Sequence, residues 1–379
     1  MQKYQTHVCL VSAQATPNIT PALDPDFRPE NVVLVVSDGM NAQATAIEDV
    51  IKPTGVKTER ITIDDAWDIR CVEDALLEWL AKHEQDSVVL NVTGGTKPMA
   101  IAAQEVFRSA GLPVFYVHPE KDQVIFLYPS GERYDLGNRI KLKPYLKAHG
   151  FETLNPQHPD LPAKGRELTE YLLGLIKDKA NLIGTLNFYA HWAEKTLVST
   201  DVEKFHLEDA DFVALIELLA SANLLSLKQN RLHFTNEESR FFCNGGWLEL
   251  YVFGVVNDLR ERLSIQDMAR SLEVVTSKGS KNEIDVAFLA ENRLFLIECK
   301  TKKFSNQSGQ QGASETLYKI DSLTSLGGVQ TKGMLISFQK LSEWDRQRAK
   351  DLRIKTVVGP DIFRLKDEIT TWVAPAKDK

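Results

Sequence analysis

The feature that most constrains this chain is a pair of apolar stretches that carry charged residues and are separated by a short turn. The three segments are Glu283-Ile284-Asp285-Val286, the turn Glu291-Asn292, and Leu296-Ile297-Glu298-Cys299-Lys300. Side chains alternate faces along a strand, so Glu298 and Lys300 project to one side and Cys299 to the other. Asp285 can come alongside from the preceding strand. The pattern predicts a largely buried hairpin that brings two carboxylates and an ammonium together.

Carboxylates in strands this apolar need a compensating partner. Removing a charge from water without a pair or a bound ion costs several kcal/mol or more. Two carboxylate oxygens suit Mg²⁺ or Mn²⁺, which prefer hard ligands and retain water. Such an ion can activate a bound water, and Lys300 can position the nucleophile or stabilise charge on the phosphate. The residues indicate metal-dependent hydrolysis of a phosphodiester, with a solvated edge hairpin carrying a weak Glu298–Lys300 pair as the alternative.

A further carboxylate, Glu249, lies in a third apolar stretch. A helix Glu, a strand Asp and then Glu-x-Lys is similar to the PD-(D/E)XK nuclease superfamily, although Ile284 stands where that family has Pro. The resemblance implies that Asp285 and Glu298 bind the metal ion and that Cys299 contributes its backbone carbonyl. The catalytic residues implied in this way are Glu249, Asp285, Glu298 and Lys300.

Composition limits the class of protein. The chain of 379 residues is long enough for two or three domains, and 43% hydrophobic with 26% charged residues is ordinary for a soluble protein. A net charge of −7 argues against a protein that coats nucleic acid nonspecifically, but it leaves room for a local basic groove. The four cysteines form no C-x-x-C pair, which supports neither a disulfide framework nor a zinc ribbon. We expect a cytoplasmic protein without a membrane segment, since neither a signal peptide nor an apolar run of about 20 residues is present.

Strands and helices are predicted to alternate through about the first 145 residues. Four apolar segments have the length and composition of strands: His7–Val11, Val32–Val36, Val88–Val92 and Val114–Val117. A covering helix is predicted where apolar residues recur at helical spacing, at Val72, Ala75, Leu76, Trp79 and Leu80. This alternation predicts a parallel sheet with helices on both faces.

The remainder of the chain divides at a polar, Pro-rich segment. Residues 151–166 are predicted to form a linker, and the residues up to about 236 are predicted to be helical with a final hairpin. Helices followed by a hairpin resemble a small winged-helix element, which either binds DNA or serves as a spacer. We therefore predict three parts, residues 1–150, 151–236 and 237–379, the last built around the nuclease residues.

A second group of residues favours binding of an anion. The strand that ends at Val92 is followed by Thr93-Gly94-Gly95-Thr96-Lys97-Pro98. Glycines let backbone amides approach a ligand, Lys97 adds positive charge, and a helix N-terminus adds its dipole. The segment matches neither the ATP nor the dinucleotide fingerprint, and a tight turn without a ligand is the simpler alternative. Residues 12–18 and 37–41 follow the first two strands, and such loops converge at the carboxyl edge of a parallel sheet.

These loops together resemble a CARF domain, the Rossmann-like sensor of cyclic oligoadenylates made during type III CRISPR immunity. The resemblance covers about 145 residues and is carried by S-x-Q-x-T-P-N and T-G-G-T-K. With the nuclease half, the whole chain is similar to CRISPR ancillary nucleases that have an N-terminal CARF domain and a C-terminal PD-(D/E)XK domain. The implied fold is α/β, with a Rossmann-like CARF domain, a small helical or winged-helix-like linker region and a restriction-endonuclease-like domain. The implied ligand-binding residues are Ser12, Gln14, Thr16, Pro17, Asn18, Ser37, Met40, Thr93, Gly94, Gly95, Thr96 and Lys97.

The resemblance implies a homodimer in which a ring of cyclic oligoadenylate lies across two CARF domains and activates cleavage. Cyclic tetra-adenylate is favoured as the activator, with the hexa-adenylate as its rival. The expected substrates are single-stranded RNA, single-stranded DNA or both, with nicking of duplex DNA as a further option. Two alternatives stay open: a nucleotide-sensing DNA-binding regulator without catalysis, and a restriction or repair endonuclease without a second messenger. The intact nuclease residues speak against the first, and the sensor-like loops speak against the second.

Positive charge near the nuclease residues is expected to contact the phosphate backbone of the substrate. The best candidates are the basic stretch 346–355 and the pair Lys302 and Lys303, which follow Lys300 directly. The alternative for the basic stretch is a solvated helix face.

Overall fold

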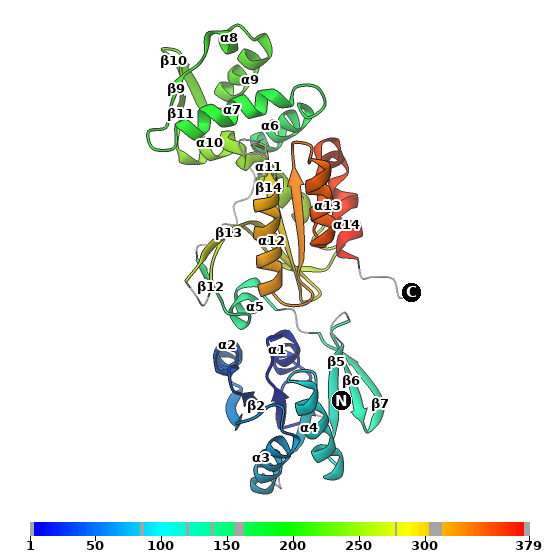
Figure 1. The fold of residues 1–379 in the computed structure, drawn as a ribbon. Helices are drawn as coiled ribbons and strands as arrows, with labels where there is room; N and C mark the ends of the chain where they lie inside the picture. Colours follow the sequence, from blue (N-terminus) through cyan, green and yellow to red (C-terminus); the bar gives the residue numbers. More distant parts are fainter. Residues whose placement is uncertain are drawn as a thin grey trace.

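The computed structural model describes residues 4–83, 87–118, 121–137, 140–154, 163–276, 279–302 and 313–374. The molecule has three parts arranged in a row (Figure 1). The N-terminal part lies at one end and the C-terminal sheet lies in the centre. The part that occupies the middle of the sequence lies at the opposite end. The order of the three parts in space therefore differs from their order along the chain.

The N-terminal part is a seven-stranded sheet of order β3-β2-β1-β4-β5-β6-β7. Its strands are β1 (Thr6–Leu10), β2 (Asn31–Ser37), β3 (Lys57–Ile63), β4 (Val88–Asn91), β5 (Val114–His118), β6 (Gln123–Tyr128) and β7 (Ser130–Asp135). The first five are parallel, and four of them, all except β3, were predicted from the sequence as a parallel sheet. The antiparallel strands β6 and β7 were not predicted. They follow β5 after short connections, and a short connection permits only an antiparallel return.

Helices cover this sheet. They are α1 (Thr16–Leu23), α2 (Asn41–Ile51), the short 3-10 helix η1 (Lys52–Thr54), α3 (Ile69–Lys82) and α4 (Lys97–Ser109). A further helix, α5 (Leu142–Ala148), packs against α2 and against β8 (Phe151–Leu154) and β12 (Ile265–Thr276) of the C-terminal part. The predicted covering helix is α3, and its Val72, Leu76 and Trp79 are buried. This confirms the helical spacing read from the sequence.

The C-terminal part is a six-stranded mixed sheet of order β16-β15-β14-β13-β12-β8. Its strands are β8 (Phe151–Leu154), β12 (Ile265–Thr276), β13 (Lys281–Ala290), β14 (Arg293–Lys300), β15 (Lys332–Ser337) and β16 (Lys355–Val358). Its helices are α11 (Trp247–Asp258), α12 (Ser314–Leu326), α13 (Glu343–Asp351), η3 (Gly359–Arg364) and α14 (Leu365–Val373). The predicted hairpin is β13–β14, and Glu291 and Asn292 form its turn with φ of 51° and 54°.

Strand β8 departs from the sequence prediction. Residues 151–154 were assigned to a linker, but they pair antiparallel with β12 as the edge strand of the C-terminal sheet. A four-residue strand has little periodicity of its own, so only its partner reveals it. Residues 155–162 of the predicted linker lie outside the described residues.

The middle part contains helices and a small antiparallel sheet of order β10-β11-β9. Its elements are α6 (Ala163–Gly174), α7 (Ala180–Trp192), β9 (Val198–Asp201), α8 (Lys204–Leu207), α9 (Ala210–Ser221), β10 (Leu225–Lys228), β11 (Arg231–Phe234), α10 (Glu237–Phe241) and the irregular helix η2 (Phe242–Gly246). Helices followed by the β10–β11 hairpin agree with the winged-helix-like prediction. Strand β9 is an addition that the sequence did not reveal.

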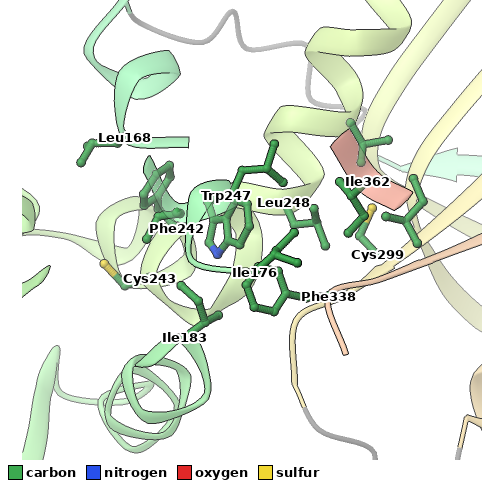
Figure 2. Close-up of a cluster of buried hydrophobic side chains, with 14 of the residues drawn as sticks. Leu168, Ile176, Ile183, Phe242, Cys243, Trp247, Leu248, Cys299, Phe338 and Ile362 are labelled. Atoms are coloured by element: carbon green, nitrogen blue, oxygen red, sulfur yellow. The ribbon is translucent and has the colours of Figure 1, made fainter. Parts of the chain in front are cut away.

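Shared hydrophobic cores join the three parts. One core contains residues of the middle part, such as Ile183 of α7, together with Trp247 of α11 and Phe338 after β15 (Figure 2). A second core joins helices of the N-terminal part to strands β12, β13 and β14, with Tyr145 of α5 and Leu323 of α12 among its members. The middle part is therefore packed against the C-terminal sheet through a continuous apolar interior.

Polar contacts reinforce the junction between the N-terminal and C-terminal parts. The Tyr145 hydroxyl donates to the Gly327 carbonyl over 3.0 Å, and the Val329 amide donates to Gln14 Oε1 over 2.9 Å. The Leu142 amide donates to Asp267 Oδ2 over 2.8 Å. The loop after α12 thus touches both α5 and the loop that follows β1.

Candidate nuclease centre and ligand loops

The nuclease residues gather where strands β13 and β14 separate. Their ladder runs from the turn to the pair Val286–Ile297 and stops there. One residue further on, the amide of Cys299 donates to Asp285 Oδ2 over 2.7 Å. Beyond this point β14 continues its parallel pairing with β15 as far as Lys300. The Asp285 carboxylate thereby accepts the hydrogen bond that a backbone carbonyl of β13 would accept if the ladder continued. This bond fixes the carboxylate beside β14.

Glu298 lies at the centre of the charged cluster, and its side chain is only 4% exposed. Its Oε1 accepts a hydrogen bond from Lys300 Nζ over 2.7 Å, as expected for residues on the same face of a strand. Lys319 of α12 also reaches Glu298, at 2.8 Å from Oε2 and 3.0 Å from Oε1. Two ammonium groups therefore neutralise one buried carboxylate.

Lys319 is a site residue that sequence analysis missed. It lies nineteen residues beyond Lys300, on a helix whose other residues carry no recognisable motif. Only the packing of α12 against β14 and β15 brings its ammonium to Glu298. No local pattern in the sequence marks it.

The electrostatics of Asp285 reflect a crowded, buried cluster. Burial and the neighbouring charge of Glu298 raise the pKa of Asp285 to about 7, against the opposing effects of Lys300, the Cys299 amide and Lys319. Burial lowers the pKa of Lys300, but the charges of Glu298 and Asp285 outweigh burial, and its pKa is raised overall. The lysine is therefore a fixed positive charge at neutral pH.

Glu249 joins this cluster from the first turn of α11. Burial, followed by the charges of Asp285 and Glu283, raises the pKa of Glu249 to about 9. Its Oε2 is buried and has no hydrogen-bond partner among the described residues. A buried acidic oxygen without a partner, beside a second carboxylate, is an environment that a cation would stabilise.

The donor set suits a hard divalent ion. Asp285 and Glu298 offer carboxylate oxygens, whereas the Cys299 side chain lies in the hydrophobic core (Figure 2). Burial raises the pKa of the Cys299 thiol well above its usual range, so only the backbone carbonyl of this residue fits as a ligand. Within the described ranges, no three His, Cys, Asp or Glu side chains are grouped so that they could hold an ion by themselves. A metal would therefore need the carbonyl and water besides the carboxylates, which is the usual coordination of Mg²⁺.

The basic stretch expected to contact substrate is partly engaged in ion pairs. Arg346 lies 3.7 Å from Glu343, and Lys355 lies 2.7 Å from Glu368. Lys302 is exposed just past the end of β14. Lys303 lies outside the described residues.

The second candidate site lies where the strand order of the N-terminal sheet reverses, between β1 and β4. The Asn91 side chain ties together the loops that follow these strands. Its Nδ2 donates to the Pro17 carbonyl over 2.8 Å, and its Oδ1 accepts from the Thr93 hydroxyl over 2.7 Å. In open α/β sheets, ligands bind at such a reversal because the loops diverge there and leave a crevice.

Gly94 and Gly95 are required by the backbone geometry of the loop that follows β4. A Cβ on Gly94 would lie 2.0 Å from the carbonyl oxygen of Leu10, and Gly95 has φ of 74°. Thr96 then caps α4, since its hydroxyl accepts from the Met99 amide over 3.3 Å. Lys97 is exposed in the first turn of α4, where positive charge and the helix dipole favour an anion together.

The remaining predicted ligand-binding residues differ in how far their side chains are exposed. Ser12, Gln14, Thr16, Pro17 and Met40 are half-buried at the carboxyl edge of the sheet, and Ser37 is buried at the end of β2. Asn18 is 1% exposed; its amide donates to the Leu10 carbonyl over 3.0 Å and its oxygen accepts from Asn91. The Asn18 side chain thus holds the two loops together in this structure, and its contact with a ligand stays a prediction.

Comparison with known protein families agrees with this architecture. Residues 6–145 match the model of a CARF domain and residues 236–376 match the model of an endonuclease domain. The fold and the site thus define a CRISPR ancillary nuclease, with an N-terminal sensor domain and a C-terminal endonuclease domain. Both matched models are those of Card1, and the chain belongs to this group of CARF endonucleases.

Solved structures extend the similarity over nearly the whole chain. Protein VC1899 from Vibrio cholerae is 28% identical, with 98% of this chain and 99% of that chain covered and a TM-score of 0.88. Can2 from Sulfobacillus thermosulfidooxidans, solved with cyclic tetra-adenylate, is 27% identical over 98% of this chain and 97% of that chain, with a TM-score of 0.80. A type III CRISPR defence DNA nuclease activated by cyclic oligoadenylate shares the fold at 20% identity and a TM-score of 0.55, over 89% of this chain and 46% of that chain. No curated protein matches the chain.

In the described residues, no helix has the length and apolar character to cross a membrane.

Proposed function

We propose that this protein is a metal-dependent endonuclease whose cleavage of single-stranded RNA, single-stranded DNA or both is activated by a cyclic oligoadenylate in type III CRISPR defence. The observation that carries the proposal is the meeting of Asp285, Glu298 and Lys300 at the point where β13 and β14 separate. Nicking of duplex DNA is included as a further activity. Cyclic tetra-adenylate is the favoured activator because Can2, similar over nearly its entire length, was solved with that ring.

The chain's own residues have distinct roles in the proposed reaction. Asp285 and Glu298, with the Cys299 carbonyl, would hold Mg²⁺ or Mn²⁺, which supplies a water of lowered pKa and neutralises charge on the phosphate. Lys300 presents a permanent ammonium to the scissile phosphate or to the attacking water. Glu249 adds a third carboxyl group beside Asp285.

The regulatory half of the proposal rests on the N-terminal part, residues 1–150, acting as a homodimer with one ring across both copies. The crevice between β1 and β4, with Lys97 and the helix N-termini at its edge, suits the phosphates of such a ring. Residues 237–379 act as the nuclease, and residues 151–236 join the two in sequence. Activation requires the ring to bind the cleaving conformation more tightly than the resting one.

A cleavage assay with Mg²⁺ or Mn²⁺, with and without cyclic tetra- or hexa-adenylate, tests the proposal directly. Wild type should cleave only with both metal and ring, and Lys300→Ala and Glu298→Ala should each lose activity by orders of magnitude while still binding the ring. Lys366→Ala is a matched control, because Lys366 pairs with Asp258 over 2.7 Å on the surface away from Glu298. Retention of more than about a tenth of the activity by both active-site variants would refute the assignment of the nuclease centre.

A further inference from the structure

Helix α7 has two faces with different roles. One face, which includes Leu182, Ile183 and Leu186, is buried in the core shared with α11, where Figure 2 shows Ile183 beside the cluster around Trp247. The other face carries two large aromatic side chains, Phe188 and Trp192, that are 51% and 58% exposed. A rigidly anchored helix that presents aromatic rings to solvent is typical of a binding surface.

Phe188 lines a groove of about 660 Å³, and the Trp192 ring lies next to it, with its centroid 6.4 Å from that of Phe188. The groove is lined by the exposed face of α7, including Phe188 and His191, by His206 of α8 and by Lys302. Phe205, 63% exposed, lies close to His206, with ring centroids 4.0 Å apart and ring planes tilted by 49°. The groove therefore spans from the middle part to the segment that leaves the nuclease centre.

The groove is connected directly to the nuclease centre. The Asn187 amide of α7 donates to the Thr301 hydroxyl over 2.9 Å, and Thr301 follows Lys300. Lys302, two residues past Lys300, forms part of the wall of the groove. A strand of substrate that leaves the scissile position along β14 therefore reaches the aromatic face of α7.

The groove offers one ammonium group to a phosphate backbone. Lys302 lines the groove, whereas nearby Arg240 is 7% exposed and paired with Glu237 over 2.5 Å. Glu194 and Glu203 are the acidic groups at this end of the groove, and both are exposed. Cations beside exposed aromatic rings are the combination by which proteins hold unpaired nucleotides.

We propose that this groove binds a single strand of the nucleic acid substrate, with unpaired bases stacked on Phe188 and Trp192 and the phosphate backbone passing Lys302 toward Lys300. The inference rests on the proposed nuclease function and adds a substrate-binding site to it. Stacking requires a free base face, which a duplex does not offer, so this site selects single strands. The middle part is then a substrate-binding element rather than only a spacer.

Binding in the presence of EDTA tests this site without cleavage. The Kd of fluorescently labelled single-stranded DNA, single-stranded RNA and a duplex of the same sequence is measured for wild type, Phe188→Ala and Trp192→Ala. Each variant should weaken single-strand binding by about five- to a hundredfold, the range for loss of one stacked base, with little effect on the duplex. Trp192→Phe keeps an aromatic ring and should restore most of the affinity. Trp67→Ala is the control, since Trp67 is 73% exposed and lies just before α3, and Figure 1 shows α3 in the N-terminal part, at the opposite end of the molecule from α7.

Three outcomes would overturn the inference: unchanged single-strand affinity in both α7 variants, an equal loss for the duplex, or an equal loss in Trp67→Ala. Thermal unfolding of the variants verifies that the exposed substitutions leave the fold intact. The proposed nuclease function has a separate test, because it would be refuted only if Lys300→Ala kept its cleavage activity. Normal cleavage with unaltered binding by the α7 variants would refute the stacking site and leave the nuclease assignment standing.

Discussion

Lys319 is predicted to compete with a divalent cation for Glu298. Its ammonium lies 2.8 and 3.0 Å from the two carboxylate oxygens, in addition to the contact from Lys300. A carboxylate engaged by two ammonium groups has less negative charge to offer a metal ion. Replacing Lys319 by Met keeps the length of the side chain and removes one competitor, so the affinity for Mn²⁺ should rise.

The size of the effect follows from the burial of the pair. Hydrogen bonds to charged groups contribute about 1.5–3 kcal/mol when buried, and exposed ion pairs contribute about 0–1 kcal/mol. Glu298 is 4% exposed and Lys319 is 31% exposed, so the contact lies between these limits. A value of about 1–2 kcal/mol corresponds to a decrease in the Kd for Mn²⁺ of roughly 5- to 30-fold.

Calorimetric titration of Mn²⁺ into the protein without nucleic acid measures this directly. Lys355→Met is the matched control, because Lys355 forms a 2.7 Å ion pair with Glu368 at similar exposure and away from Glu298. Lys319→Arg keeps the charge and should leave the Kd near that of wild type. An unchanged or weaker Mn²⁺ affinity in Lys319→Met, or an equal gain in Lys355→Met, would refute the reasoning.

Three further predictions concern the N-terminal part. Lys97→Ala and Ser12→Ala should raise the concentration of cyclic tetra-adenylate needed for half-maximal cleavage, with the rate at saturation unchanged; a lower saturated rate with unaltered ring affinity by calorimetry would contradict a sensor role. Gly94→Ala should lower ring affinity by at least about tenfold, because its Cβ would lie 2.0 Å from the Leu10 carbonyl oxygen, whereas Gly174→Ala, with open space around it, should not. His7 is buried between Phe27 and Phe115 with both ring nitrogens lacking a partner among the described residues, and burial lowers its pKa to about 3. The unfolded state therefore binds one proton more than the folded state between about pH 6.5 and 3, and wild type loses stability as pH falls through that window, by up to about 1.4 kcal/mol per pH unit. The free energy of unfolding of His7→Leu, measured with urea between pH 4.5 and 7, should depend on pH less steeply than that of wild type, by up to that amount per pH unit. An identical pH dependence in the two proteins would show that His7 is not buried in its neutral form.

The sequence by itself specified the nuclease hairpin, through the alternation of side chains along its strands. Alternation along β14 places Glu298 and Lys300 on one face and Cys299 in the core, and the structure confirms all three positions. Such features are readable because the physical constraint acts between residues that are neighbours in sequence or share one strand.

Tertiary structure alone decided the features that join distant segments. The contact of Lys319 with Glu298 depends on how α12 packs on the sheet, and the burial of Asn18 depends on its bond to Asn91 from another strand. The strand β8 exists only through its pairing with β12, and the aromatic face of α7 lies beside Lys302 only because a shared core anchors that helix. Nothing in the periodicity of a single segment specifies which other segment it will meet, since that depends on the summed packing of the whole chain.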